Sequence, residues 1–261
     1  MITLSIVSHR QAALVAALLD DVARIASPHV AAIIVTHNIA EPAPAWPESL
    51  APRIVTIVNA SPRGFGANHN AAFRRCATPY FAVMNPDLRL IADPFDELVA
   101  LFASATLQTP DAARIGVAAP YIVAADGTPE DAARGLITPI ELIRRRGARA
   151  NRAPSKAPHW LAGMFLVVSS EAFRAVGGFD ERYFMYCEDF DLCARLRLAG
   201  WALAIAEHAS VVHVAQRASH RSPAYLRWHL ASLAKMWASK AFWRYRRMLI
   251  AETRDGSATK P

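Results

Sequence analysis

The sequence has few cysteines and no long apolar segment. Only three cysteines occur in 261 residues, and their odd number and wide spacing argue against a disulfide framework and for reduced thiols, as in the cytoplasm. A helix that spans a bilayer needs about 20 apolar residues in succession, and even stretches such as Trp160 to Val168 fall short. The N-terminus enters a strand-like run without a secretion-signal pattern. We therefore expect a cytoplasmic protein without a membrane-spanning helix.

Acidic residues are absent from most of the C-terminal part. Between His208 and Ala251 there is no Asp or Glu, while eight Lys and Arg side chains lie there; the whole chain, with 29 basic and 22 acidic residues, has a net charge of +7. Aromatic residues lie among these cations, namely Trp228, Trp237, Phe242, Trp243 and Tyr245. This pattern is typical of a helix on an anionic membrane surface, although a solvated basic helix packed on the core fits equally. A second basic segment, Arg134 to Pro158, is predicted to be a loop.

The apolar pattern at the start of the chain predicts an α/β fold. Ile2 to Ser8 has the character of a buried strand, Gln11 to Ile25 of a helix, and Val30 to Thr36 of a second buried strand. Such an opening implies a mainly parallel sheet whose ligand crevice lies beyond the C-terminal ends of the strands. The residues expected at these ends are Ser8, His9, Arg10, His37 and Asn38.

Two short motifs place polar groups after strands. The segment Asn59 to Asn70 contains a glycine turn that leads into a helix; Gly64 and Gly66 permit close approach of the backbone, and a helix N-terminus favours negative charge. Asn85-Pro86-Asp87 ends another apolar strand, where the Asp87 carboxylate is placed to meet a divalent cation on a diphosphate. Taken singly, each motif also fits a plain connection or turn.

The most informative stretch is acidic and aromatic. Five acidic residues occur within twelve positions from Asp180 to Asp191. Burying carboxylates among aromatic rings is costly unless they are paired or functional, although an acidic helix start is the simpler alternative. Glu188 and Asp189 directly follow Tyr-Phe-Met-Tyr, which indicates a base beside an apolar platform. Trp160 and Tyr186 are candidates for that platform, with a place in the core as the alternative.

Together these motifs resemble family 2 of the inverting glycosyltransferases, most closely the bacterial rhamnosyltransferase type that builds surface polysaccharides. The resemblance covers roughly Met1 to Ser219. It implies a glycosyltransferase-A fold over residues 1–219, with a Rossmann-like, mainly parallel mixed sheet flanked by helices, followed by basic amphipathic helices over 220–261. The motifs that carry it are Ser5-Ile6-Val7-Ser8-His9, Gly64 to Asn70, Asn85-Pro86-Asp87, Trp160-Leu161-Ala162-Gly163, Gly177-Gly178-Phe179-Asp180 with Glu188-Asp189, and His213.

The resemblance also implies roles for residues. Asp87 and His213 would bind Mg²⁺ or Mn²⁺ on the donor diphosphate, and Asp189 would be the catalytic base that deprotonates the acceptor hydroxyl, an effect worth about 10² to 10⁴ in rate. Glu188 would orient the acceptor, for which Trp160 and Tyr186 are the binding candidates. The donor-binding candidates are Ser8, His9, Arg10, His37, Asn38, Gly64, Phe65, Gly66, Asn70, Asn85, Asp87 and Gly163.

One position departs from the family pattern. His37 stands where the family has an Asp that contacts the nucleotide base or ribose; an imidazole can still form hydrogen bonds there, but it is no carboxylate. The nucleotide preference is therefore open, with thymidine or uridine diphosphate as the leading candidates.

The expected function is metal-dependent, inverting transfer of a sugar, with rhamnose as the leading candidate, to a glycan or lipid-linked glycan in cell-surface polysaccharide synthesis. The expected place is the cytoplasmic face of the membrane, and no nucleic acid is expected as a partner. The alternatives are a non-catalytic polyanion-binding protein or a degenerate transferase that only binds nucleotide. The sequence leaves open the sugar, the acceptor hydroxyl and the oligomeric state.

Overall fold

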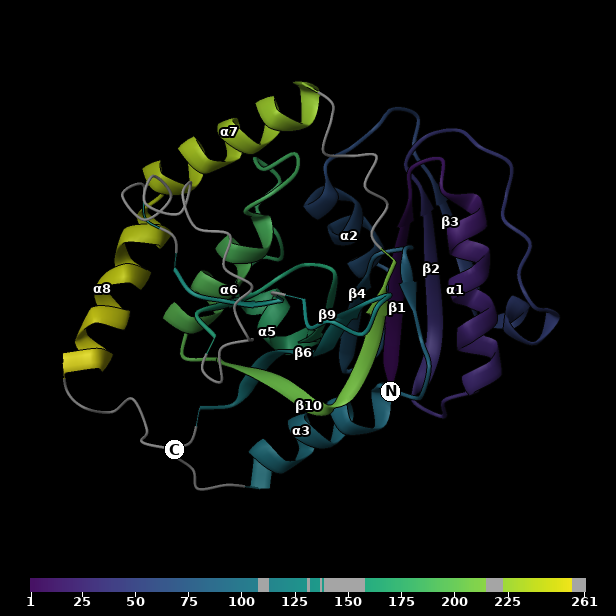
Figure 1. Ribbon diagram of the computed structural model, residues 1–261, viewed down its shortest axis with the longest axis horizontal. Helices are drawn as coiled ribbons and strands as arrows, with labels where there is room; N and C mark the ends of the chain where they lie inside the picture. The colour runs from purple at the N-terminus through teal and green to yellow at the C-terminus, as the bar shows by residue number, and fades with distance from the viewer. Residues whose placement is uncertain (108–112, 131, 137, 139–157, 215–222, 255–261) are drawn as a thin grey trace.

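The computed structural model describes residues 1–107, 113–130, 132–136, 138, 158–214 and 223–254. An eight-stranded sheet runs through the molecule with helices on both faces (Figure 1). The order of its strands is β3-β2-β1-β4-β9-β6-β10-β5, and β7 and β8 form a separate two-stranded sheet. The strands are β1 (Ile2–Ser8), β2 (Val30–His37), β3 (Ile54–Val58), β4 (Tyr80–Met84), β5 (Leu88–Arg89), β6 (Ile115–Ala124), β7 (Ala133–Arg134), β8 (Trp160–Leu161), β9 (Phe165–Ser169) and β10 (Ala202–His213).

The described helices alternate with these strands in the first half and gather at the C-terminus. They are α1 (Ala12–Ile25), the 3₁₀ helix η1 (Glu48–Arg53), α2 (Phe65–Phe73), α3 (Phe95–Leu107), α5 (Ser170–Ala175), α6 (Glu188–Leu198), α7 (Pro223–Ala238) and α8 (Lys240–Arg254). None of them is long and apolar enough to cross a membrane.

The strand directions bring the C-terminal ends of several strands to one edge of the sheet. Strands β1, β2, β3 and β4 are parallel to one another, β6 and β10 are a second parallel pair, and β9 runs antiparallel between them. Ser8 pairs with His37 and Ile6 pairs with Met84, so the C-terminal ends of β1, β2 and β4 lie side by side. The predicted βαβ opening and mainly parallel mixed sheet are confirmed.

Alternating side chains along β4 show how the sheet separates two apolar layers. Ala82 and Met84 pack on the layer of α1 and α3, whereas Phe81 and Val83 pack on the layer of α2, α5 and α6. This period of two is what a strand buried on both faces requires. Apolar packing on both faces therefore stabilises the sheet, and polar side chains lie in the loops that follow its strands.

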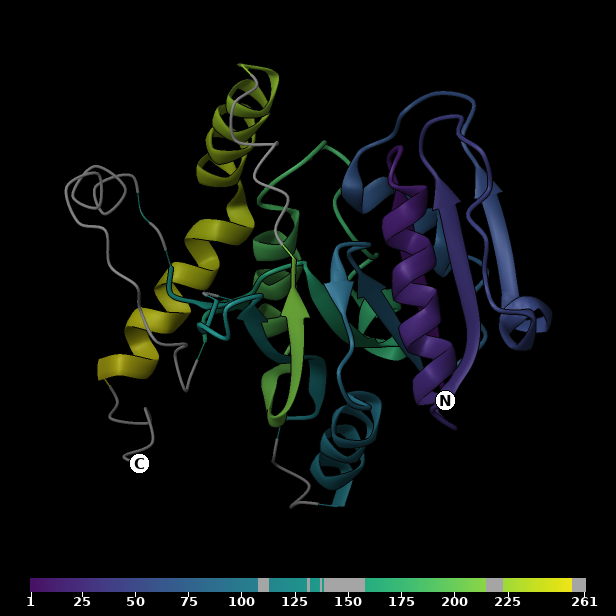
Figure 2. The ribbon, with the colours of Figure 1, turned by 45° about the vertical axis from the view of Figure 1, so that its right-hand side comes forward.

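The two C-terminal helices pack on the second layer. Phe242 and Tyr245 of α8 are fully buried, the Tyr245 hydroxyl donates a hydrogen bond to the carbonyl oxygen of His159 at 2.5 Å, and Arg197 pairs with Glu252 at 2.7 Å. Figure 2 shows α8 running along the flank of the molecule below α7. The predicted division of the chain at residue 219 stays a prediction.

Candidate functional site

The loops after β1, β2 and β3 are joined by asparagine side chains. Asn38 donates a hydrogen bond to the carbonyl oxygen of Arg63 at 2.9 Å, and its own oxygen accepts from the Arg63 N–H at 2.7 Å and from Asn59 at 2.8 Å. Asn59 also donates to Asn68 at 2.7 Å. Asn38 therefore fixes the glycine turn against the end of β2. Asn59 and Asn68, which lie in the predicted glycine-turn segment but were not among the predicted site residues, complete this network.

The glycine turn packs directly against the segment from Asp180 to Cys187 that precedes α6, here called the acidic loop. A Cβ at Gly64 would lie 2.7 Å from the carbonyl oxygen of Phe184, and the N–H of Phe65 donates to that same oxygen at 2.9 Å. At Gly66 a Cβ would lie 2.6 Å from the Cβ of Phe179. Both glycines are thus required for close packing.

The predicted donor-binding residues around this turn have different surroundings. Asn70 bonds the backbone of Phe179 with both its amide atoms, at 2.8 and 2.9 Å, so it holds the acidic loop in place. The Ser8 hydroxyl accepts from the N–H of Gln11 at 3.2 Å, while His9 and Arg10 are exposed. Arg10 has a φ of 60°, an uncommon value for a residue with a side chain.

Asp87 and His213 are brought together by a short pairing of strands. His213 ends β10 opposite Leu88 of β5, which directly follows the Asn85-Pro86-Asp87 turn. Nε2 of His213 lies 3.3 Å from Oδ2 of Asp87, and its Nδ1 lies 2.8 Å from Oε2 of Glu130. The hydrogen bond to Asp87, with help from Glu130, raises the pKa of His213 to about 9. The sequence predicted the first pair but not Glu130.

This cluster suits a divalent cation, judged by its atoms. Oδ1 of Asp87 is buried and has no hydrogen-bond partner among the described residues. Glu130 holds Nδ1 of His213 and thereby turns Nε2 toward Asp87, which is how carboxylates commonly orient metal-binding imidazoles. Across the described ranges no three acidic, His or Cys residues converge on one point, so the cluster offers two ligands and leaves other positions for phosphate or water.

The acidic pair lies at the start of α6. The Asp189 carboxylate accepts hydrogen bonds from the N–H of Gly163 at 2.9 Å and of Phe190 at 2.8 Å. Burial raises its pKa above the ordinary value, although these two backbone donors lower it. Glu188 is buried, burial and the Asp189 charge raise its pKa well above the ordinary value, and its Oε2 has no partner in the described parts of the chain.

A short run of backbone links the two clusters. The N–H of Asn85, two residues before Asp87, donates to the carbonyl oxygen of Met164 at 2.9 Å. Gly163, the residue before Met164, donates to Asp189. The Asp87–His213 pair and the half-buried Asp189 carboxylate therefore lie on adjoining segments.

Strained backbone precedes the acidic pair. Tyr186 and Cys187 have φ values of 73° and 67°, consecutive left-handed conformations that cost on the order of 1–3 kcal/mol each. Such strain is often found at functional sites. The Tyr186 ring lies 4.9 Å from that of His229 on α7, so the C-terminal segment contributes to this side of the site.

Trp160, predicted as a platform for the acceptor, has its side chain packed in the interior of the protein. Its side chain is buried, its indole N–H donates to the carbonyl oxygen of Gly135 at 3.1 Å, and Arg134 lies over its ring at 5.0 Å. Arg134 is paired in β7 rather than in a loop, and most of the predicted loop up to Pro158 lies outside the described residues. The Arg134 charge in turn lowers the pKa of Asp189.

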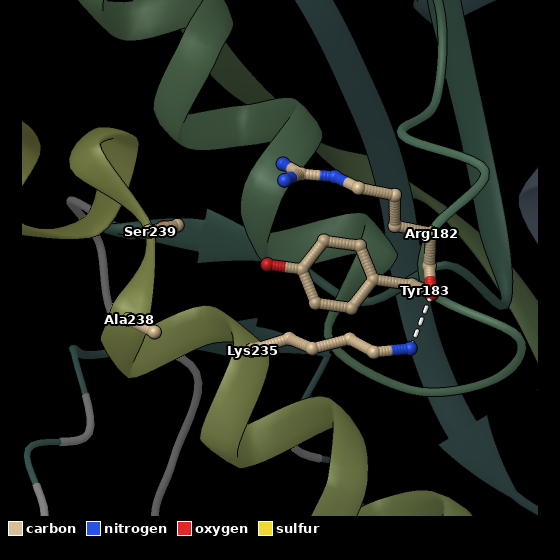
Figure 3. A pocket seen from close by; sticks show the side chains of 5 residues that line it. All are labelled: Arg182, Tyr183, Lys235, Ala238 and Ser239. Atoms are coloured by element: carbon tan, nitrogen blue, oxygen red, sulfur yellow. Dashed lines mark hydrogen bonds between the residues drawn. The ribbon is translucent and has the colours of Figure 1, made fainter.

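A separate pocket lies between the acidic loop and the C-terminal end of α7. It has a volume of about 450 Å³ and is bounded by the loop and the end of α7; Figure 3 shows Tyr183 lying between the side chains of Arg182 and Lys235. Lys235 donates a hydrogen bond to the carbonyl oxygen of Arg182 at 2.5 Å. None of the predicted site residues lines it, so we do not assign it a role in the chemistry.

Comparison with known proteins gives a partial sequence match. No family model matches the chain. Over 80 residues it is 49% identical to the N-acetylglucosaminyl-diphospho-decaprenol L-rhamnosyltransferase of Mycobacterium tuberculosis, covering 30% of this chain and 25% of that protein. Over 85 residues it is 46% identical to rhamnosyltransferase WbbL of Escherichia coli K12, covering 31% of each. The matched stretch thus spans about a quarter to a third of these relatives, and within it the predicted resemblance is confirmed.

Solved structures resemble the chain over most of its length. GalNAc-T7 with UDP, GalNAc and Mn²⁺ has a TM-score of 0.63 at 15% identity, covering 85% of this chain and 45% of that one. TarS of S. aureus has a TM-score of 0.59 at 10% identity, covering 82% and 36%. Mannosyltransferase PcManGT of Pyrobaculum calidifontis, with GDP-Man and Mn²⁺, has a TM-score of 0.51 at 14% identity, covering all of this chain and 76% of that one. The predicted glycosyltransferase-A fold is confirmed.

Proposed function

We propose that the protein is a metal-dependent, inverting glycosyltransferase of the rhamnosyltransferase type. The observation that carries this proposal is the pairing of Asp87 with His213 on a segment that adjoins, through Asn85 and Met164, the segment that binds the half-buried Asp189. The sequence match to rhamnosyltransferases and the likeness to nucleotide-sugar enzymes support it.

The donor side is formed by the ends of the parallel strands. Asp87 and His213 would hold Mg²⁺ or Mn²⁺, which supplies positive charge to the departing nucleotide diphosphate. The N-terminus of α2, packed on the acidic loop through Gly64, adds a backbone site that favours anions. His37 and Asn38 lie at the end of β2, where the nucleotide would rest.

Asp189 would act as the base. Its two backbone hydrogen bonds fix the orientation of the carboxylate, and each oxygen keeps a further lone pair for the acceptor hydroxyl. Burial raises its pKa, which makes it a stronger base than an exposed Asp. The hydroxyl oxygen forms a bond to the anomeric carbon while the bond to the diphosphate breaks on the opposite face, so the configuration inverts. Glu188 would orient the acceptor.

The acceptor would be a glycan carried on a lipid diphosphate, as the name of the mycobacterial relative states for that protein. A peripheral place on an anionic membrane, on its cytoplasmic side, would bring the enzyme to such a substrate. Exposed apolar side chains on α7 and α8 support this: Leu226, Leu230, Trp243 and Ile250 lie among the basic residues of these helices.

Thermal melting with added ligands tests the proposed activity. UDP or dTDP together with Mn²⁺ should raise the melting temperature more than either component alone, because a ligand that binds only the folded state stabilises it. Transfer from a dTDP- or UDP-linked sugar should then be measured with a lipid-diphosphate glycan acceptor. A shift with DNA or another polyanion, but with no nucleotide, would refute the proposal and favour a polyanion-binding protein.

A further inference from the structure

The side chain at the end of β2 is paired with a buried carboxylate. Nδ1 of His37 lies 3.1 Å from Oε1 of Glu41, and these two side chains are only 5% and 4% exposed. The other Glu41 oxygen accepts a hydrogen bond from the N–H of Ala12 at 3.2 Å. Ala12 begins α1, whose Gln11 cap provides no side-chain hydrogen bond, so Glu41 caps that helix and is held from two sides.

This pairing decides which nitrogen of His37 carries a proton. An ionised carboxylate only accepts hydrogen bonds, so Nδ1 must be the donor toward Glu41. In a neutral imidazole Nε2 then has a lone pair and no proton. No described residue forms a hydrogen bond with Nε2, so within the described parts of the chain this lone pair has no partner.

We propose that Glu41 is a positioning residue that makes His37 a hydrogen-bond acceptor for the nucleotide base. The acceptor at Nε2 would take the place of the carboxylate that the resembling family has at this position. Its ligand would be a pyrimidine with an N–H at ring position 3, as in uracil or thymine. Cytosine has a lone pair there and would leave two acceptors facing each other, which costs binding. This inference rests on the proposed function.

The selectivity can be measured with nucleotides alone. Titration calorimetry of the full chain with Mn²⁺ should show UDP binding about 5- to 100-fold more tightly than CDP, the range for leaving a polar group without a partner. In Glu41→Gln the amide can either accept from or donate to Nδ1, so the proton of His37 can sit on either ring nitrogen. The ratio of UDP to CDP affinity should then fall to about 3-fold or less. Glu48→Gln, which changes an exposed carboxylate on η1, should keep the wild-type ratio.

Two further variants separate recognition from folding. His37→Asn leaves Glu41 in place as the cap of α1 but presents both a donor and an acceptor, so it should lose the preference without loss of the helix cap. The double variant His37→Asp with Glu41→Gln supplies a carboxylate acceptor without a second charge beside it, and should recover the preference for UDP. His37→Asp alone places two carboxylates together and should bind UDP more weakly than the double variant.

The ring itself gives a direct readout. In ¹⁵N spectra of the nucleotide-free protein, the signal that disappears in His37→Asn should show a protonated Nδ1 and an unprotonated Nε2, and it should change in Glu41→Gln. Equal binding of UDP and CDP by the wild type, or an unchanged ratio in Glu41→Gln, would overturn the inference while leaving the proposed function standing. Absence of any nucleotide diphosphate binding would instead refute the proposed function.

Discussion

Replacing Asp189 with Asn should slow sugar transfer about 10²- to 10⁴-fold while leaving the protein folded. The carboxylate accepts two backbone hydrogen bonds, from Gly163 at 2.9 Å and from Phe190 at 2.8 Å. An amide has one oxygen, so one of these donors would face an NH₂ group, at a cost of about 1–3 kcal/mol. Because burial raises the pKa of Asp189, its charged form is already disfavoured, and removing the charge offsets part of that cost.

The expected loss of rate is larger than the expected loss of stability. A domain of this kind has about 5–15 kcal/mol of stability, so a change of about 1–3 kcal/mol leaves nearly all molecules folded. Loss of the base should lower kcat about 10²- to 10⁴-fold, which corresponds to about 3–5 kcal/mol in the barrier. Unfolding therefore cannot account for such a loss.

Initial rates at saturating donor and acceptor measure this effect, with melting curves and UDP binding as checks of folding. Glu188→Gln is the matched comparison, because it changes the neighbouring carboxylate; it should lower kcat less than Asp189→Asn. The raised pKa of Asp189 also predicts that the wild-type rate climbs with pH over a range above that of an exposed Asp. If Asp189→Asn keeps turnover within about 3-fold of wild type, or if Glu188→Gln is the more damaging change, Asp189 is not the base.

The remaining predictions concern stability and the cation. The pKa of Glu188 is raised in the folded state, so protonated Glu188 is compatible with folding at low pH, and the free energy of unfolding falls as the pH rises and the side chain ionises. Glu188→Gln should therefore melt at a higher temperature than wild type near pH 7 but not near pH 4. A difference in melting temperature that does not depend on pH would contradict this. Gly64→Ala should destabilise by about 1–3 kcal/mol in urea unfolding, whereas Gly135→Ala, with open space around it, should be near neutral. Glu130→Gln should weaken Mn²⁺ binding about 10- to 100-fold in calorimetry by releasing the His213 ring, and unchanged affinity would argue against that role.

The βαβ opening and its parallel strands were predicted from the sequence because burial is nearly uniform along these strands. Ile2–Ser8 and Val30–His37 are almost wholly buried, and a continuous apolar run of that length has few other folds open to it. The far half was harder to foresee. Strand β9 inserts antiparallel between β4 and β6, and nothing in its apolar residues distinguishes the two directions.

The cluster of Asp87, His213 and Glu130 illustrates where prediction from sequence stops. His213 was assigned through family resemblance, and its position beside Asp87 depends on the two-residue strand β5, too short to recognise by pattern. Glu130 lies 83 residues from His213 and meets it because the chain reverses after β6. The chain turns at Asp126 and Gly127, where Gly127 has a φ of 80° and donates a hydrogen bond to the carbonyl oxygen of Ala124.

His37 shows that a departure from a family pattern can be balanced by a residue outside the motif. From sequence, losing the carboxylate at this position put the nucleotide preference in doubt. Glu41, four residues on in a segment rich in proline and alanine, carried no signal of its own because its role depends on the start of α1 coming to meet it. A carboxylate, that of Glu41, is thus present in this region, but it contacts His37 rather than a position at the strand end itself. The acceptor that a pyrimidine needs would then depend on two residues instead of one, so a substitution at Glu41 should alter nucleotide preference without touching the nucleotide.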